Sequence, residues 1–264
     1  MGYNLEHYHD DPWIKYAEQE IRSNYGDSVS VLAKSKSLLK FGKNTDLGTS
    51  SETVQAQGGN ETYVTTNAID TISSSSASDT NEVTVEGHTI SGGVFTFVTQ
   101  TVTLTGQTKA LLATPLARCS RVYNVGAVNM LGNIYVYEDT AISSGAPTDA
   151  TKIHVRILAG EQQTYKCSTT FSDGDYAIIT NGFATVDKKT AASVDFVFEV
   201  RPAGSVFRPV LEFGISTNGG AFIMPLQPFV VVPKNADIRV TAAASTTGVS
   251  VRAGFQAALA SVIE

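Results

Sequence analysis

A small cluster of possible metal ligands lies near the start of the chain. His7, His9, Asp10 and Asp11 are residue types that bind transition metals, and a two-residue spacing puts both imidazoles on one side of an extended segment. The two remaining histidines lie far along the chain. A solvated terminal segment explains the cluster better than a metal site does. We therefore predict neither a metal nor any other cofactor.

A second group of residues could cleave glycosidic bonds. Glu82, Glu86, Glu138 and Asp139 would need to converge in pairs across a cleft to act as acid and base. Each lies on or at the end of a segment that alternates apolar with polar residues, where an outward carboxylate is ordinary. The sequence also lacks the nucleophile elbow, the phosphate-binding loop, the zinc-protease motif and the dinucleotide fingerprint. We predict that the chain is not an enzyme, and a polysaccharide-cleaving activity ranks last among the hypotheses.

Two other patterns suggest ligands only weakly. Asp173 and Asp175 in TFSDGDY resemble part of a calcium loop, but the register and the final glutamate of an EF-hand are missing, so we predict a turn. Tyrosines on predicted strands could line a sugar site, although strand tyrosines are more often half-buried in a sheet. The members of this set are Tyr123, Tyr135, Tyr137, Tyr165 and Tyr176. Host glycan therefore stays as an alternative ligand.

The elements that would position these residues are mostly β-strands. About a dozen short segments after residue 60 alternate apolar with polar residues, and Gly, Asn, Asp or Pro separates them. In SVDFVFEV, Phe196 and Phe198 point to one face and Asp195 and Glu199 to the other. Many short strands with turn signals and no helical pattern between them indicate a sandwich or a barrel. We predict an all-β fold, a jelly-roll-like β-sandwich over residues 61–264.

The number of β-domains is open at this level. The low-complexity run TISSSSASDT is a candidate boundary. We favour a single domain, because the strands on either side are similar in composition and the first part alone would have a thin core.

Residues 1–60 differ from the rest and are predicted to form an attachment arm with one short α-helix. Asp11 can cap a helix, and Pro12 suits its first turn, where a missing N–H has no cost. Gly26 can end the helix in a left-handed conformation. An irregular segment rich in Gly, Asn and Ser follows, and such segments often run along a partner.

The predicted helix has a narrow apolar face. Ile14, Ala17, Ile21 and Tyr25 recur at roughly helical spacing, and an isolated helix of this length is marginal in water. It must therefore dock, either on its own β-domain or on a neighbouring subunit or larger shell. Large apolar residues provide contact area at small entropic cost. The predicted interface residues of the arm are Trp13, Ile14, Ile21, Tyr25, Leu38, Leu39 and Phe41.

Composition excludes several classes of partner. Hydrophobic residues make up 42% and charged residues 17%, which leaves little charge for a monomer's surface and suggests that partners cover part of it. The net charge is −6 without a dense basic cluster, so we expect no nucleic-acid partner. No apolar run spans a bilayer, and the first residues lack the parts of a signal peptide, so we expect synthesis in the cytoplasm and no membrane partner. Cys119 and Cys167 are predicted to be reduced core residues, with a disulfide between adjacent strands as the alternative.

Several segments together resemble one group of proteins. These are LLKFGKNTDLGTSSETV, a loop with two glycines, TISSSSASDT, NEVTVEG, FTFVTQTVTLTG and ASTTGVSVRAGFQAALA. In order and composition they are similar to structural proteins of tailed bacteriophages, particularly of marine phages. The resemblance begins at about Lys40 and implies a β-sandwich body carried on the virion, with the N-terminal part as the attachment.

The favoured functional hypothesis is therefore an accessory structural protein of a tailed-phage virion. It would decorate the capsid or belong to the neck or tail, bind other virion proteins through the arm, and form a symmetric homo-oligomer, because closed assemblies leave no unpaired surface. The alternative hypothesis is a carbohydrate-binding, host-recognition module of the virion.

Overall fold

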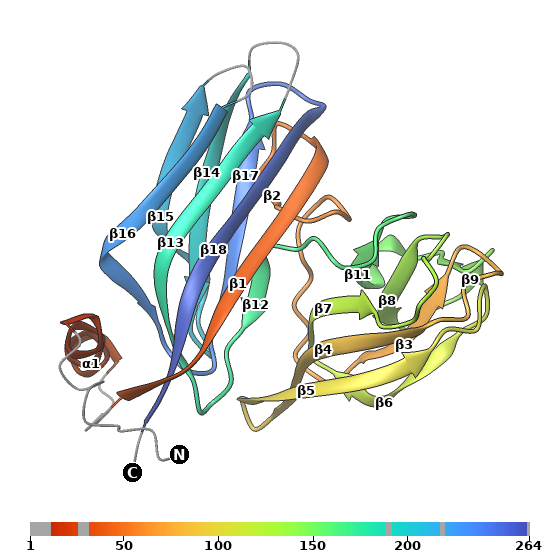
Figure 1. Ribbon diagram of the computed structural model, residues 1–264, viewed down its shortest axis with the longest axis horizontal. Coiled ribbons are helices and arrows are strands. Elements are labelled where there is room, and N and C mark those ends of the chain that lie inside the picture. Colours follow the sequence, from red (N-terminus) through yellow and green to blue (C-terminus); the bar gives the residue numbers. More distant parts are fainter. Residues whose placement is uncertain (1–11, 26–31, 188–191, 217–219, 263–264) are drawn as a thin grey trace.

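The described part of the chain folds into two β-sandwiches and one α-helix, as the computed structural model shows (Figure 1). The structure describes residues 12–25, 32–187, 192–216 and 220–262, and within these ranges the side chains at 12–14, 25, 32–35 and 226–229 are left aside. The sandwiches lie side by side, and the helix lies at one end of the first (Figure 1). In the described part of the chain, no helix has the length and apolar content needed to cross a membrane.

The first sandwich contains eight principal strands. They are β1 (Leu32–Leu47), β12 (Ser168–Thr170), β13 (Tyr176–Asp187), β14 (Ser193–Arg201), β15 (Arg208–Ser216), β16 (Gly220–Val232), β17 (Asp237–Ala244) and β18 (Val249–Val262). One sheet has the order β1-β18-β13-β16 and the other the order β12-β17-β14-β15, with the short β2 (Glu52–Thr53) also paired to β17.

The pairing of these strands defines a jelly roll. The first strand pairs with the last, β1 with β18, and the second with the second last, β12 with β17. The same nesting continues inward, with β13 on β16 and β14 on β15, and every pair is antiparallel. An antiparallel ribbon rolled up in this way is the eight-stranded, two-sheet jelly roll. The predicted all-β, jelly-roll-like sandwich is thus confirmed.

The second sandwich is inserted between β1 and β12. Its strands are β3 (Ile69–Ser74), β4 (Glu82–Ser91), β5 (Val94–Thr103), β6 (Ala110–Leu116), β7 (Arg118–Asn124), β8 (Ile134–Glu138) and β11 (Ile153–Ile157). They form sheets of order β11-β8-β3-β6 and β5-β4-β7. A small hairpin, β9 (Ile142–Ser143) with β10 (Ala146–Pro147), and the 3-10 helix η2 (Ala150–Lys152) complete it.

Each sandwich has its own hydrophobic core. Phe196, Phe198 and Phe255 are buried in the core of the jelly roll, whereas Ile72 and Leu116 are buried in that of the inserted sandwich. This differs from the single β-domain favoured for residues 61–264. Strands of similar composition can bury their apolar faces in either of two cores, so composition gives no boundary between them.

The predicted arm divides into a docked helix and a sheet strand. The helix α1 (Pro12–Tyr25) forms where it was predicted, and Ala17 and Ile21 are fully buried against Ile178 and neighbouring jelly-roll residues. Of the two docking alternatives, the structure therefore shows the first: α1 docks on the chain's own β-domain. From Leu32 on, the chain pairs along β18, so β1 is an integral strand of the jelly roll and the body begins well before residue 61.

Candidate functional site

The two sandwiches meet along β7, and a buried carboxylate lies at the centre of the contact. Asp237 of β17 accepts a hydrogen bond from Arg118 Nε of β7 at 2.9 Å, and a second guanidinium, that of Arg201, donates to it from Nε at 3.0 Å. The hydroxyl of Thr170 donates to the same carboxylate at 2.6 Å. Burial alone would raise the pKa of Asp237, but Arg118 and then Arg201 hold this pKa below its ordinary value. The carboxylate is therefore ionised and links both bodies.

The next two residues of β7 accept hydrogen bonds from buried lysines. Lys166, just before β12, donates to the carbonyl of Cys119 at 2.9 Å and forms an ion pair with Glu61 at 2.6 Å. Lys40 of β1 donates to the carbonyl of Ser120. Because three consecutive residues of β7 are bonded to the jelly roll or its flanking segment, the junction is a specific polar interface.

Aromatic rings cover the arginines of this junction. The guanidinium of Arg118 lies 5.0 Å from the ring centroids of both Tyr63 and Phe95. Arg201 lies 4.2 Å from the ring of Tyr63, which packs 5.1 Å from Phe207. Rings placed over cations keep water away and add attraction to the ring faces. They thereby reinforce the charged pairs at Asp237.

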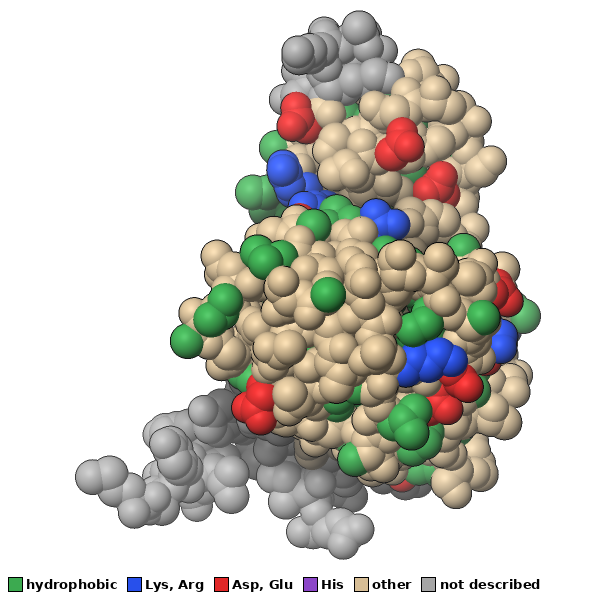
Figure 2. Space-filling view, turned by 90° about the vertical axis from the view of Figure 1, so that its right-hand side faces the viewer, with side chains coloured by type: hydrophobic (Ala, Val, Ile, Leu, Met, Phe, Trp, Pro, Cys, Tyr) green, Lys and Arg blue, Asp and Glu red, His purple; other side chains and the backbone are tan. Residues whose placement is uncertain are grey.

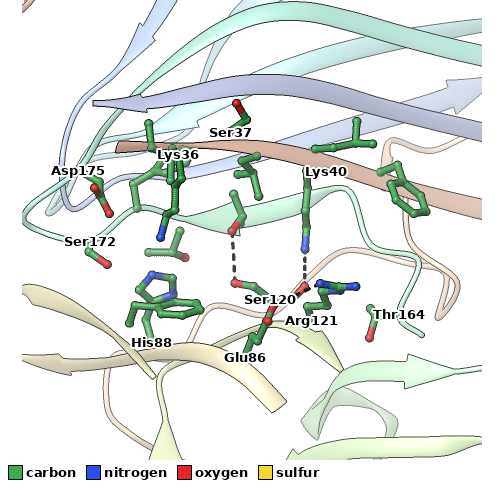
Figure 3. A pocket seen from close by; sticks show the side chains of 18 of the residues that line it. Lys36, Ser37, Lys40, Glu86, His88, Ser120, Arg121, Thr164, Ser172 and Asp175 are labelled. Atoms are coloured by element: carbon green, nitrogen blue, oxygen red, sulfur yellow. Dashed lines mark hydrogen bonds and ion pairs between the residues drawn. The ribbon is translucent and has the colours of Figure 1, made fainter. Parts of the chain in front are cut away.

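A cavity of about 540 Å³ lies beside this network, between the two sandwiches (Figure 3). Its jelly-roll wall includes Lys36 and Lys40 of β1, and its opposite wall includes Glu86 and His88 of β4 and Arg121 of β7. In Figure 3 the side chains of both lysines extend from β1 toward the inserted sandwich. The cavity therefore exists only because the two bodies are held together.

The open side of the jelly roll is a second feature of the surface. Strands β15 and β16 are the outer strands of the two sheets, while the opposite outer strands, β1 and β12, lie beside the inserted sandwich (Figure 1). Val206, just before β15, is 67% exposed, Val210 is 41% exposed and Ile223 of β16 is 71% exposed. This side thus combines sheet edges with exposed apolar side chains.

The outer face of the inserted sandwich has a different character. Figure 2 shows it with scattered charged side chains and separate small apolar groups, and without a dense cluster of Lys and Arg. Leu111, Val128 and Leu131 are exposed apolar residues of this body. Singly exposed apolar residues are normal on a protein surface, so this face shows no built site by itself.

The predicted interface residues of the arm have several different environments. Trp13, Ile14 and Tyr25 lie in α1, but their side chains are outside the described residues. Ile21 is buried against the jelly roll. Leu38 is half-buried against the jelly-roll core, and Phe41 is half-buried against the ring of Tyr165. Leu39 is 54% exposed. The structure does not bring these side chains together on one surface.

The residues predicted to do other chemistry are also dispersed. Glu86 lies 3.9 Å from Arg121, Glu138 bonds His154 at 3.1 Å, and Asp139 pairs with Lys109. No group of three His, Cys, Asp or Glu suited to a metal occurs among the described residues, and His7 and His9 lie outside them. Three of the five strand tyrosines are buried and cannot stack on a sugar, namely Tyr135, Tyr137 and Tyr176.

Two local predictions are confirmed. The segment at Asp173 and Gly174 is a turn between β12 and β13. Cys119 and Cys167 are buried free thiols, and burial raises the pKa of each to about 12. Both cysteines therefore behave as small core residues.

The junction between the two sandwiches is not apparent from the amino-acid sequence. Lys166 and Asp237 lie in segments interpreted as half-exposed strands, where a charge normally faces water, and Arg118 lies just before another such segment. Arg118 and Lys166 each precede a cysteine that was predicted to be buried. Because neighbouring residues of a strand face opposite sides, this position indicates an outward charge, and no local pattern identifies the buried ion pairs.

Comparison with known proteins adds little to this description. No protein-family model matches the chain, and no curated protein matches it. A structure of infectious bursal disease virus Gt strain is 12% identical, covering 96% of this chain and 78% of that chain with a TM-score of 0.26. The VP2 subviral particle of the same virus is 11% identical, covering 95% and 77%, with a TM-score of 0.23. Scores this low lie below the level of a shared fold, so the jelly-roll assignment depends on the strand pairing itself.

Proposed function

We propose that this chain is a non-enzymatic structural protein of a virus particle, and that its jelly rolls associate with one another through the open side at β15 and β16. The observation that carries the proposal is the asymmetry of the jelly roll's two sides. Among the described residues, one side is covered by the inserted sandwich, and the other exposes Val206, Val210 and Ile223 on or just before the outer strands β15 and β16, with α1 packed against β16 near Val231. Exposed edges with apolar side chains are unfavourable in a monomer and are suited to burial by a partner.

A second copy of the chain is the partner that fits this side. Jelly rolls occur in viral capsid proteins as well as in lectins, and they leave sheet edges that neighbours can cover. Repeating one contact around a closed ring buries every copy's edge and leaves none unpaired. The inserted sandwich lies on the opposite side of the jelly roll, so each copy would still present it (Figure 1).

The assignment to a tailed-phage virion is the finer part of the proposal. It is supported by the resemblance of the segments from Lys40 onward to tailed-phage structural proteins, and by the shortage of charged residues, 17% of the chain. In this role the protein would be an accessory component on the capsid, the neck or the tail, bound to other virion proteins.

The oligomeric state tests the proposal. Light scattering on the full chain should give the mass of a defined oligomer, and Ile223→Asp should reduce this mass to that of a monomer, because a carboxylate would be buried in the contact. Val128→Asp is the matched control, since Val128 is equally exposed but belongs to the inserted sandwich. It should leave the mass unchanged.

Circular dichroism of both variants establishes that they are folded. A wild-type chain that is monomeric at all accessible concentrations would contradict the proposed association. An Ile223→Asp variant that keeps the oligomeric mass would show that the open side is not the interface.

A further inference from the structure

The cavity between the two sandwiches has the size and composition of a small-molecule site. Its volume, about 540 Å³, falls in the range of ligand pockets, which combine apolar walls with a few convergent polar groups. Leu38, Phe97, Phe171 and Leu259 line its apolar parts, and they come from both bodies. No role in assembly uses this cavity, so it requires a separate explanation.

A buried cation borders the cavity without a carboxylate partner. Lys40 is buried, its ammonium donates to the carbonyl of Ser120, and no carboxylate among the described residues forms an ion pair with it. Burial lowers the pKa of Lys40 to about 8, and the charge of nearby Lys166 lowers it as well. A buried ammonium with one neutral acceptor is poorly compensated, and an anion in the cavity would compensate it.

Two further polar groups point to the same occupant. Lys36 lies on the cavity wall, with its ammonium 5.4 Å from the centroid of the Phe97 ring. His88 faces Lys36 across the cavity (Figure 3). Its Nδ1 atom is buried and has no hydrogen-bond partner among the described residues. Buried polar atoms are nearly always paired, so an unpaired one on a cavity wall suggests a missing bound partner.

The carboxylates in and near the cavity only partly offset its positive charges. Glu86 is paired with Arg121, at 3.9 Å, on the side of the cavity nearest the inserted sandwich. Asp175 accepts a hydrogen bond from the hydroxyl of Ser261 at 3.2 Å. The charge of Glu61 partly offsets the lowering of the Lys40 pKa, but Glu61 itself is ion-paired with Lys166 at 2.6 Å. The cations that line the cavity, Lys36, Lys40 and Arg121, therefore outnumber its lining carboxylates, Glu86 and Asp175.

We propose that this cavity binds a small organic anion, with its carboxylate or sulfonate group near Lys40 and Lys36 and its apolar body between Phe97 and Phe171. His88 would form a hydrogen bond to the ligand through Nδ1. Because the walls belong to both sandwiches, the bound anion would also hold the inserted sandwich at a fixed angle to the jelly roll.

The probe for this proposal is 8-anilinonaphthalene-1-sulfonate, an aromatic sulfonate whose fluorescence rises in apolar surroundings. The full-length protein should bind it saturably at one site. Lys40→Met, which keeps the aliphatic length and removes the charge, should weaken this binding at least about tenfold. The control Lys109→Met removes a lysine of the inserted sandwich that pairs with Asp139 far from the cavity, and it should bind the probe as the wild type does.

A second probe separates the charge from the apolar contact. N-phenyl-1-naphthylamine has the same rings without the sulfonate, and it should bind wild type and Lys40→Met equally weakly. Lys40→Met should remain folded, because replacing a buried charge by an apolar group of similar volume is often neutral or stabilising. Equal affinity of the sulfonate for wild type and Lys40→Met would overturn the proposal, as would equal affinity of the wild type for both probes.

Discussion

At the scale of single residues, the most consequential group is the carboxylate of Asp237. It accepts hydrogen bonds from Arg118, Arg201 and Thr170 in a place with little access to water. A buried ion pair contributes little compared with an apolar replacement, but removing one partner leaves the others charged, buried and unpaired. Asp237 should therefore be far more sensitive to substitution than an exposed acid.

We expect Asp237→Asn to lower the free energy of unfolding by about 3 kcal/mol, measured by urea denaturation at neutral pH. Asp139→Asn is the control, because Asp139 forms a solvent-exposed pair with Lys109, and exposed pairs contribute little to stability. Similar losses in the two variants would contradict the role given to the junction.

The lowered pKa of Asp237 predicts that the stability of the fold depends on pH. The pKa of Asp237 is below its ordinary value of 3.8 in the folded chain, so the unfolded chain takes up the proton first as the pH falls. The stabilisation from this ionised carboxylate is complete above that ordinary value and is lost as the pH falls through the folded pKa. The difference in stability between wild type and Asp237→Asn should therefore shrink below about pH 4.

At the scale of elements, α1 and β1 have different roles although both belong to the predicted arm. The helix contacts the outside of the sandwich through Ala17 and Ile21. Strand β1 pairs with β18 over nearly its whole length, and its last residue, Leu47, is fully buried in the jelly-roll core. Gly42 of β1 runs so close to β2 and β12 that an added Cβ would lie 2.1 Å from the carbonyl oxygen of Val54.

Two truncations should separate these elements. Removing residues 1–25 should leave a cooperatively folded protein whose melting temperature falls by a few degrees, because one apolar contact of the sandwich surface is exposed. Removing residues 1–47 should abolish cooperative unfolding, because β18 loses its partner and the core loses Leu47. Thermal unfolding followed by circular dichroism measures both. A cooperative transition in the longer truncation would show that β1 is dispensable.

At the scale of the whole molecule, the inserted sandwich is formed by one continuous stretch of chain, whereas the jelly roll is formed by two stretches on either side of it. The inserted sandwich consists of consecutive strands with a core of its own, whereas the jelly roll needs β1 from one side of the insertion and β12 to β18 from the other. A continuous segment of this size with its own core has the properties of an independent domain.

We expect residues 61–163, expressed alone, to fold cooperatively, as measured by urea denaturation and circular dichroism. Their stability should be lower than in the full chain, because Arg118 loses Asp237 and the carbonyls of Cys119 and Ser120 lose their lysine donors. A segment that shows no cooperative transition would mean that the junction is needed to fold the insertion.

The junction shows why the candidate site could not be predicted. Arg118 and Asp237 are 119 positions apart, and Lys40 and Ser120 are 80 apart. Whether a strand charge such as that of Lys40 faces water or a second domain depends on which surface lies opposite. Neither the burial of Lys40 nor the cavity beside it follows from any local pattern.

The sequence by itself determined the local structure. Alternation placed Phe196 and Phe198 inside, and the signals at Pro12 and Gly26 located α1, because these features depend on neighbouring residues. Only the tertiary structure decided that β1 belongs to the jelly roll, that the strands pair in a nested order, and that a second sandwich is inserted after the first strand. Alternation specifies which face of a strand is buried, but it does not specify the strand that lies beside it.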